Sequence, residues 1–251
     1  MGDTLSADTV HFPGDGGDDI EAYLARPGSG QDRGGVVVIH HMPGYDRATK
    51  EIVRRFAEIG YDAICPNLYW REAPGAAPDD AAATARASGG VPDDRLVGDV
   101  AGAAAYLRSL DRSNRKVGVI GYCSGGRQSV LAACRTDLDA AVDCYGAFVT
   151  GTPPEGFPLQ VSNLTALLPE LGCPLLGLFG NEDSYPSPEQ VDELEAILKE
   201  NGKTYEFHRY DNAGHGFFAV DRAMYRVDAA NAGWQAITGF YTRYLGNPAG
   251  N

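Results

Sequence analysis

The fold is decided by one stretch of the chain, Lys116-Val117-Gly118-Val119-Ile120-Gly121-Tyr122-Cys123-Ser124-Gly125-Gly126. Its apolar first half predicts a buried strand, and the residues after it, 127–134, are compatible with a helix. Gly121 and Gly125 flank Cys123 at two positions either side, where a missing Cβ lets strand and helix approach closely through a sharp turn. Such a turn exposes the Cys123 side chain and directs the Ser124 amide the same way, at the positive end of the helix. The pattern predicts a reactive cysteine, and the alternative is a glycine-rich turn around a buried one.

Two later segments carry the partners that a nucleophile on such a turn requires, in the order acid and then histidine. The apolar run 174–180 ends in Asn181-Glu182-Asp183, which places carboxylates just past a buried strand. The strand-like run 204–210 leads into a loop that holds His215 between two glycines. We therefore predict a triad of Cys123, Asp183 and His215, with Glu182 as the alternative acid.

Composition limits the classes of partner. The 251 residues are 43% hydrophobic, enough for one large α/β domain spanning residues 1–251. The formal charge of −13 argues against nucleic acid and anionic membranes as partners. Five cysteines without paired close spacing suggest neither a disulfide framework nor a metal site. The first eight residues lack a basic or an apolar segment, which favours a cytoplasmic protein. We expect a monomer or a small homo-oligomer.

The rest of the chain alternates between strand-like and helix-like segments. This alternation predicts an α/β fold with a doubly wound, mostly parallel sheet and antiparallel N-terminal edge strands. We expect strands at 9–12, 20–25, 36–40, 61–65 and 140–144, and helices near 52–59, 93–110, 188–200 and 224–244. The stretches 67–90 and 145–167, the second of which contains Phe148, Phe157 and Pro158, are expected to be irregular and to cover a site beyond the strand ends.

The chain resembles the dienelactone hydrolase (carboxymethylenebutenolidase) family, whose hallmark is a cysteine nucleophile in G-x-C-x-G-G on an α/β-hydrolase fold. The motif reads Gly121-Tyr122-Cys123-Ser124-Gly125-Gly126 here, and the segments 65–75 and 213–217 look like the family too. The resemblance implies an ester or lactone hydrolase that uses the predicted triad without a metal or an organic cofactor. The backbone amides of Met42 and Ser124 would then form the oxyanion hole.

Two departures from the family concern the substrate. His41 replaces a glutamate that contacts the nucleophile in the family, and it either tunes Cys123 or is an ordinary loop residue. Ala219 replaces an arginine that binds the substrate carboxylate in the family, and Arg86 cannot be aligned with the second such arginine. We therefore expect an uncharged, partly apolar ester or lactone.

Four more residues are candidate substrate contacts: Trp70, Arg71, Tyr145 and Phe217. Arg71 could either hold a substrate anion or anchor its own loop. The leading hypothesis is a thiol hydrolase that acts on an activated (enol-type) lactone or small ester. The alternatives are a non-hydrolytic ligand-binding protein on the same fold and a redox thiol protein, although no second cysteine lies near Cys123 in the sequence.

Overall fold

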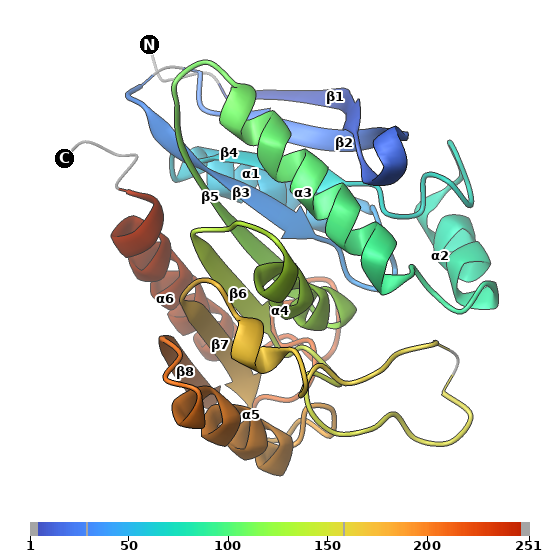
Figure 1. The fold of residues 1–251 in the computed structure, drawn as a ribbon, viewed down its shortest axis with the longest axis vertical. Helices are drawn as coiled ribbons and strands as arrows, with labels where there is room; N and C mark the ends of the chain where they lie inside the picture. The colour runs from blue at the N-terminus through green and yellow to red at the C-terminus, as the bar shows by residue number, and fades with distance from the viewer. Residues whose placement is uncertain (1–4, 29, 158, 247–251) are drawn as a thin grey trace.

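An eight-stranded sheet runs through the molecule (Figure 1). The computed structural model describes residues 5–28, 30–157 and 159–246, so Pro158 of the second irregular stretch lies outside it. The strand order is β1-β2-β4-β3-β5-β6-β7-β8. The strands are β1 (Ser6–Pro13), β2 (Asp19–Arg26), β3 (Arg33–Ile39), β4 (Asp62–Pro66), β5 (Ser113–Tyr122), β6 (Ala140–Cys144), β7 (Leu175–Gly180) and β8 (Tyr205–Tyr210).

The predicted sheet topology is confirmed. β1 pairs with β2, and β2 with β4, in antiparallel fashion, whereas every pairing from β4 to β8 is parallel. The order is that of an α/β-hydrolase fold, with β5 in the middle between β3 and β6. The carboxyl ends of β3, β5, β7 and β8 therefore meet at one edge of the sheet, where ligands of such sheets bind.

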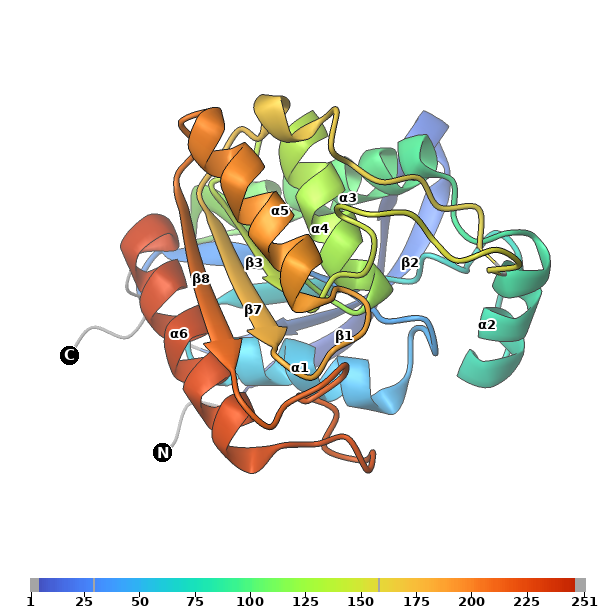
Figure 2. The same cartoon turned by 90° about the horizontal axis from the view of Figure 1, so that it is seen from below.

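Helices cover both faces of this sheet (Figure 2). α1 (Arg47–Glu58) and α6 (Val227–Leu245) pack on one face through apolar residues such as Phe56 and Trp234. α3 (Asp93–Ser109), α4 (Ser124–Arg135) and α5 (Pro188–Glu200) pack on the other face through residues such as Val100 and Val130. Because β3, β4, β6 and β7 are buried along their whole length, their near-continuous apolar runs are explained by burial on both faces.

One prediction of irregular structure was wrong. The stretch 67–90 contains α2 (Pro78–Ala87), which begins with Pro78 at its first turn beside Asp79 and Asp80. These residues favour a helix start, and alanine is the best helix former. The helix buries only three alanines, Ala81, Ala82 and Ala85, so it lacks the stripe of large apolar side chains by which the other helices are recognised. The stretch 145–167 has no helix or strand among its described residues, as expected.

No helix in the described ranges combines the length and the apolar character needed to cross a bilayer.

Candidate active site

Cys123 lies on the turn between β5 and α4, with φ 57° and ψ −121°. This left-handed conformation is rare for a residue with a side chain, and the flanking glycines make it possible. A Cβ on Gly121 would lie 1.8 Å from the Gly125 carbonyl oxygen, and one on Gly125 would lie 2.6 Å from the Ile39 carbonyl oxygen. The turn is thus packed against both its own helix and the neighbouring strand, and it holds the half-buried Cys123 in a fixed position.

The loops after β7 and β8 bring an acid and a base together. His215 Nδ1–H donates a hydrogen bond of 2.9 Å to Asp183 Oδ2. The other oxygen of Asp183 accepts from the Tyr185 amide at 2.9 Å, and Asp183 is only 6% exposed. Glu182, the alternative acid in the sequence, is exposed. Of the two carboxylates, Asp183 is the one paired with the histidine.

Cys123 lies close enough to His215 to raise the pKa of the imidazole, so Cys123, His215 and Asp183 lie together at one site. Burial alone would lower the pKa of His215, but the hydrogen bonds and charges of Asp183 and Cys123 outweigh it and raise this pKa to about 10. The His215 side chain is 37% exposed, so solvent partly screens these interactions. The imidazole is therefore positioned to carry a proton at neutral pH.

The predicted oxyanion residues lie on one small cavity of about 40 Å³, which both Met42 and Ser124 line. Ser124 is the first residue of α4, where backbone amides point outward unpaired by the helix itself. Met42 lies in the turn after β3, and its carbonyl oxygen accepts a hydrogen bond of 3.0 Å from the Tyr69 hydroxyl. This turn and the helix start therefore border the same cavity, and Ser124 directly follows Cys123 in the chain.

His41 forms a second histidine–carboxylate pair near the first. Its Nε2–H donates to Asp46 Oδ2 at 2.8 Å, and Asp46 Oδ1 caps α1 by accepting from the Thr49 amide at 2.8 Å. Burial would raise the pKa of Asp46, but the hydrogen bonds from His41 and Thr49 lower it to about 2. His41 is thus held in place by a charged carboxylate.

The preceding residue, His40, is buried, and burial lowers its pKa to about 4. It donates to the His41 carbonyl at 2.9 Å and accepts from the Leu68 amide at 3.3 Å, which is the arrangement of a neutral ring. Its task is to tie the turn after β3 to the segment after β4.

Tyr145 and Phe217 both lie near the base but differ in what they can contact. The Tyr145 ring lies 5.2 Å from the rings of His215 and Phe217, in edge-to-face arrangements. Tyr145 has φ 45°, and it lines a large cavity that is described below. Phe217 is fully buried, so its ring supports Tyr145 from within the core and has no surface for a substrate.

Comparison with known proteins identifies the family of this chain. A sequence model described as the dienelactone hydrolase family matches residues 20–245. The chain belongs to the dienelactone hydrolase family. A carboxymethylenebutenolidase of Pseudomonas putida is 30% identical over 203 residues, which cover 78% of this chain and 79% of that protein. A Salmonella typhimurium protein provisionally given the same name is 32% identical over 96% of this chain and 89% of its own length. A crystal structure from Klebsiella pneumoniae, provisionally named a dienelactone hydrolase, superimposes with a TM-score of 0.84 at 26% identity, over 96% of this chain and 100% of that one.

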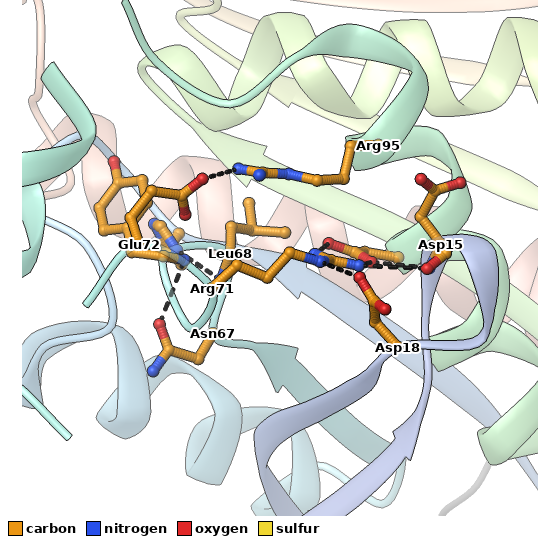
Figure 3. Close-up of polar contacts among 10 residues, drawn as sticks. Asp15, Asp18, Asn67, Leu68, Arg71, Glu72 and Arg95 are labelled. Atoms are coloured by element: carbon orange, nitrogen blue, oxygen red, sulfur yellow. Dashed lines mark hydrogen bonds and ion pairs between the residues drawn. The ribbon is translucent and has the colours of Figure 1, made fainter. Parts of the chain in front are cut away.

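Membership in the dienelactone hydrolase family makes the protein a carboxylic ester or lactone hydrolase. Within it, Arg71 is engaged by the protein's own carboxylates (Figure 3). Its guanidinium donates to Asp18 at 2.6 Å and to both oxygens of Asp99 at 2.8 and 2.9 Å. The Nη2 group that donates to Asp99 Oδ1 also donates to the Asp15 carbonyl oxygen, at 3.3 Å. These contacts favour the anchoring interpretation of Arg71 over the substrate-binding one.

Trp70 also points to the β1 side of the molecule, where its ring lies 5.7 Å from that of His11. It is partly buried against the cluster of apolar residues that includes Phe12 and Leu96. Neither cavity described here has Trp70 in its lining. Arg71 and Trp70 therefore brace the segment after β4 and are not brought to the candidate triad.

The sequence reasoning missed Asp143, a carboxyl at the end of β6. It is fully buried, its Oδ1 accepts from the Gly146 amide at 2.7 Å, and its Oδ2 has no hydrogen-bond partner among the described residues. Burial raises its pKa to about 7, although the Gly146 amide and the charge of His215 act in the opposite direction. The only signal in the sequence was a lone acidic residue in the apolar run 140–144.

Proposed function

We propose that this hydrolase cleaves activated esters or lactones with Cys123 as nucleophile, His215 as acid and base, and Asp183 as the group that orients His215. One observation carries the proposal: His215 is hydrogen-bonded through Nδ1 to the buried Asp183 and also contacts Cys123 on its strained turn. A nucleophile, a base and a third group that fixes the base are the parts that covalent hydrolysis needs.

The first half-reaction forms a thioester. The Cys123 thiolate attacks the carbonyl carbon, and the amides of Met42 and Ser124 donate to the oxyanion that develops. The carbon–oxygen bond to the leaving group then breaks, and that oxygen takes the proton from the free ring nitrogen of His215. Because a thiolate is expelled from the tetrahedral intermediate more readily than an ordinary alkoxide, only a substrate with a good leaving group goes forward. An enol lactone or an aryl ester meets this condition.

The second half-reaction needs His215 without its proton. Two of the interactions that raise the His215 pKa are its hydrogen bond and charge interaction with Cys123. Both are lost when the sulfur is acylated, so the pKa of His215 falls in the acyl-enzyme. The neutral imidazole can then take a proton from water, which attacks the thioester and releases the acid and the Cys123 thiolate.

The test is hydrolysis of phenyl acetate by four purified variants. We expect Cys123→Ala and His215→Ala to lose activity while their circular dichroism is unchanged, and Asp183→Asn to retain a small residual rate because the base remains but is poorly oriented. Cys173→Ala removes another free thiol, one that is buried away from the site, and serves as the matched control with near-normal kcat/KM.

The same assay separates the alternative functions. Turnover that persists in reductant but is lost in Cys123→Ala excludes both a ligand-binding protein and a redox thiol protein. Normal turnover by Cys123→Ala would refute the proposed mechanism.

A further inference from the structure

A second, larger cavity of about 360 Å³ lies between α1, α6 and the loop after His215. Its apolar wall includes Ile52, Tyr122, Tyr145, Phe218, Ala219 and Trp234. It shares no lining residue with the small cavity at Met42 and Ser124. The site therefore has two separate spaces of very different size.

The large cavity adjoins the candidate nucleophile. Tyr122, in its wall, directly precedes Cys123, and Tyr145, also in its wall, has its ring 5.2 Å from that of His215. Cys123 itself packs against the apolar cluster that includes Tyr122, Tyr145 and Trp234. A carbonyl whose oxygen is directed to the Met42 and Ser124 amides can thus extend an attached group into the large cavity.

The cavity suits an uncharged group of more than one ring. An apolar cavity of about 150 Å³ is large enough to hold benzene, and this one is more than twice that volume. The charged residues of the lining lie on its α1 and loop edges, where Arg47 and Arg55 are balanced by Glu51 and Asp221, and the imidazole of His41 is paired with Asp46. Arg55 is moreover 3.9 Å above the Trp234 ring, so its charge is partly satisfied within the protein. The edge has no excess of positive charge with which to select an anion.

Tyr122, in the wall, carries a hydroxyl group. The Tyr122 hydroxyl is buried and has no hydrogen-bond partner in the described part of the chain. The hydroxyl is thus withdrawn from the cavity, which Tyr122 lines with the apolar part of its ring.

We propose that the large cavity is the subsite for the bulkier of the two groups attached to the scissile carbonyl, and that the substrates are neutral esters or lactones carrying an aromatic or alicyclic group larger than one benzene ring. This inference rests on the proposed function, because it takes Cys123 as the attacking group.

A kinetic test uses two esters that differ in size but hardly in leaving-group chemistry, phenyl acetate and 2-naphthyl acetate. Ala219→Trp fills the cavity, and we expect it to lower the ratio of kcat/KM for the naphthyl ester over the phenyl ester at least tenfold. A second pair, phenyl acetate and phenyl cyclohexanecarboxylate, shares the leaving group and differs in the size of the acyl group. It tests the orientation in which the acyl group enters the cavity. Ala105→Trp, at an exposed position of α3 on the opposite face of the sheet, is the matched control and should leave both ratios unchanged. Ratios within twofold of wild type for both pairs in Ala219→Trp would overturn the proposal.

A binding test keeps the cavity intact and does not depend on turnover. The chain has two tryptophans, so in Trp70→Phe/Cys123→Ala only Trp234, in the cavity wall, remains fluorescent. We expect methyl 2-naphthoate to quench this fluorescence saturably and 2-naphthoate to bind at least tenfold more weakly. No saturable quenching, or tighter binding of the carboxylate, would overturn the proposal. If Cys123→Ala remained active while the quenching held, the proposed function would fail and the binding site would stand.

Discussion

At Cys123, the backbone has a positive φ of 57°. For a residue with a Cβ this conformation costs on the order of 1–2 kcal/mol. The strain is tolerated because β5, α4 and the end of β3 pack around the turn without room to relax. His215 and Asp183 complete the site through their hydrogen bond of 2.9 Å. The proposed reaction at this site depends on whether His215 holds its proton.

The proton on His215 can be followed by pH. The His215 pKa is raised to about 10, so His215 loses its proton only as the pH approaches that value. We therefore expect kcat/KM of the wild type for phenyl acetate to decrease on the alkaline side of its pH profile near this pH. Asp183→Asn removes a hydrogen bond to a carboxylate and its charge, so the limb should move to lower pH by at least one unit. Glu182→Gln, a neighbouring exposed carboxyl, is the control, and a limb that does not move in Asp183→Asn would contradict this assignment.

Asp143 makes a second, independent prediction about pH. Its folded-state pKa of about 7 lies above the ordinary value of 3.8, so the folded protein binds more protons than the unfolded chain between these two values. Stability must therefore decrease as the pH rises from about 4 to 7, by at most roughly 4 kcal/mol for a shift of this size. Asp143→Asn keeps an acceptor for the Gly146 amide and removes this dependence.

Urea unfolding at pH 5 and pH 8 checks the Asp143 prediction. The unfolding free energy of Asp143→Asn, relative to that of wild type, should be higher at pH 8 than at pH 5. Asp137→Asn, an exposed carboxyl just before the same strand, should show no such change. Parallel pH dependence of Asp143→Asn and wild type would mean that Asp143 is not the titrating group.

At the scale of elements, α1 begins at the turn that carries His41. Asp46 is both its N-cap and the partner of His41. Replacing an N-cap by alanine costs typically about 1 kcal/mol, and asparagine caps equally well. We expect Asp46→Ala to lower stability relative to Asp46→Asn by that amount, as measured by urea unfolding. Ser187→Ala, at the N-cap of α5 far along the chain, should cost a similar amount.

The same variants test whether His41 affects Cys123. The other four cysteines are buried, so iodoacetamide should label Cys123 selectively. If His41 tunes Cys123, His41→Ala and Asp46→Ala should change the pH profile of this alkylation in the same direction, because each breaks the His41–Asp46 pair. Ser187→Ala should leave the profile unchanged. Overlapping profiles for wild type and His41→Ala would make His41 a bystander.

The elements differ in how well the sequence predicts them, for physical reasons. Buried parallel strands are continuous apolar runs, and helices on the sheet carry stripes of large apolar residues, so both are predictable. α2 buries only alanines, which carry no such stripe. The candidate triad follows from local turn chemistry and chain order. Asp143 and the large cavity depend on which segments meet after folding, and nothing in the local sequence records this.

At the scale of the whole molecule, Arg71 joins three segments that are distant in sequence. It connects the segment after β4 with Asp18, before β2, and with Asp99 in α3, which is fully buried. Removing one partner of a buried ion pair costs about 3–5 kcal/mol, because the other charge remains unpaired. We expect a loss of this order in Arg71→Ala and partial recovery in Arg71→Ala/Asp99→Asn, both measured by urea unfolding.

Kinetics distinguish this structural role from substrate binding. If Arg71 is an anchor, Arg71→Ala should leave the ratio of kcat/KM for a carboxylated and a neutral ester unchanged. Arg135→Ala, which breaks an exposed pair with Glu170, is the control and should cost less than about 1 kcal/mol. A selective loss of activity on the carboxylated ester in Arg71→Ala would restore the anion-binding interpretation.

The glycines under the site have a consequence for anyone who wishes to redesign this enzyme. A methyl group on Gly121, Gly126, Gly146 or Gly180 would lie within 1.8 to 2.4 Å of neighbouring atoms, most of them backbone. These four glycine positions, the floor of the site, therefore cannot accept even the smallest side chain. We expect most variants with substitutions at them to misfold. Ala219 and Phe218, in the loop after His215, and Ile52, in α1, line the large cavity as part of its apolar wall. New substrate ranges should be sought by mutating that wall while the floor is left as it is.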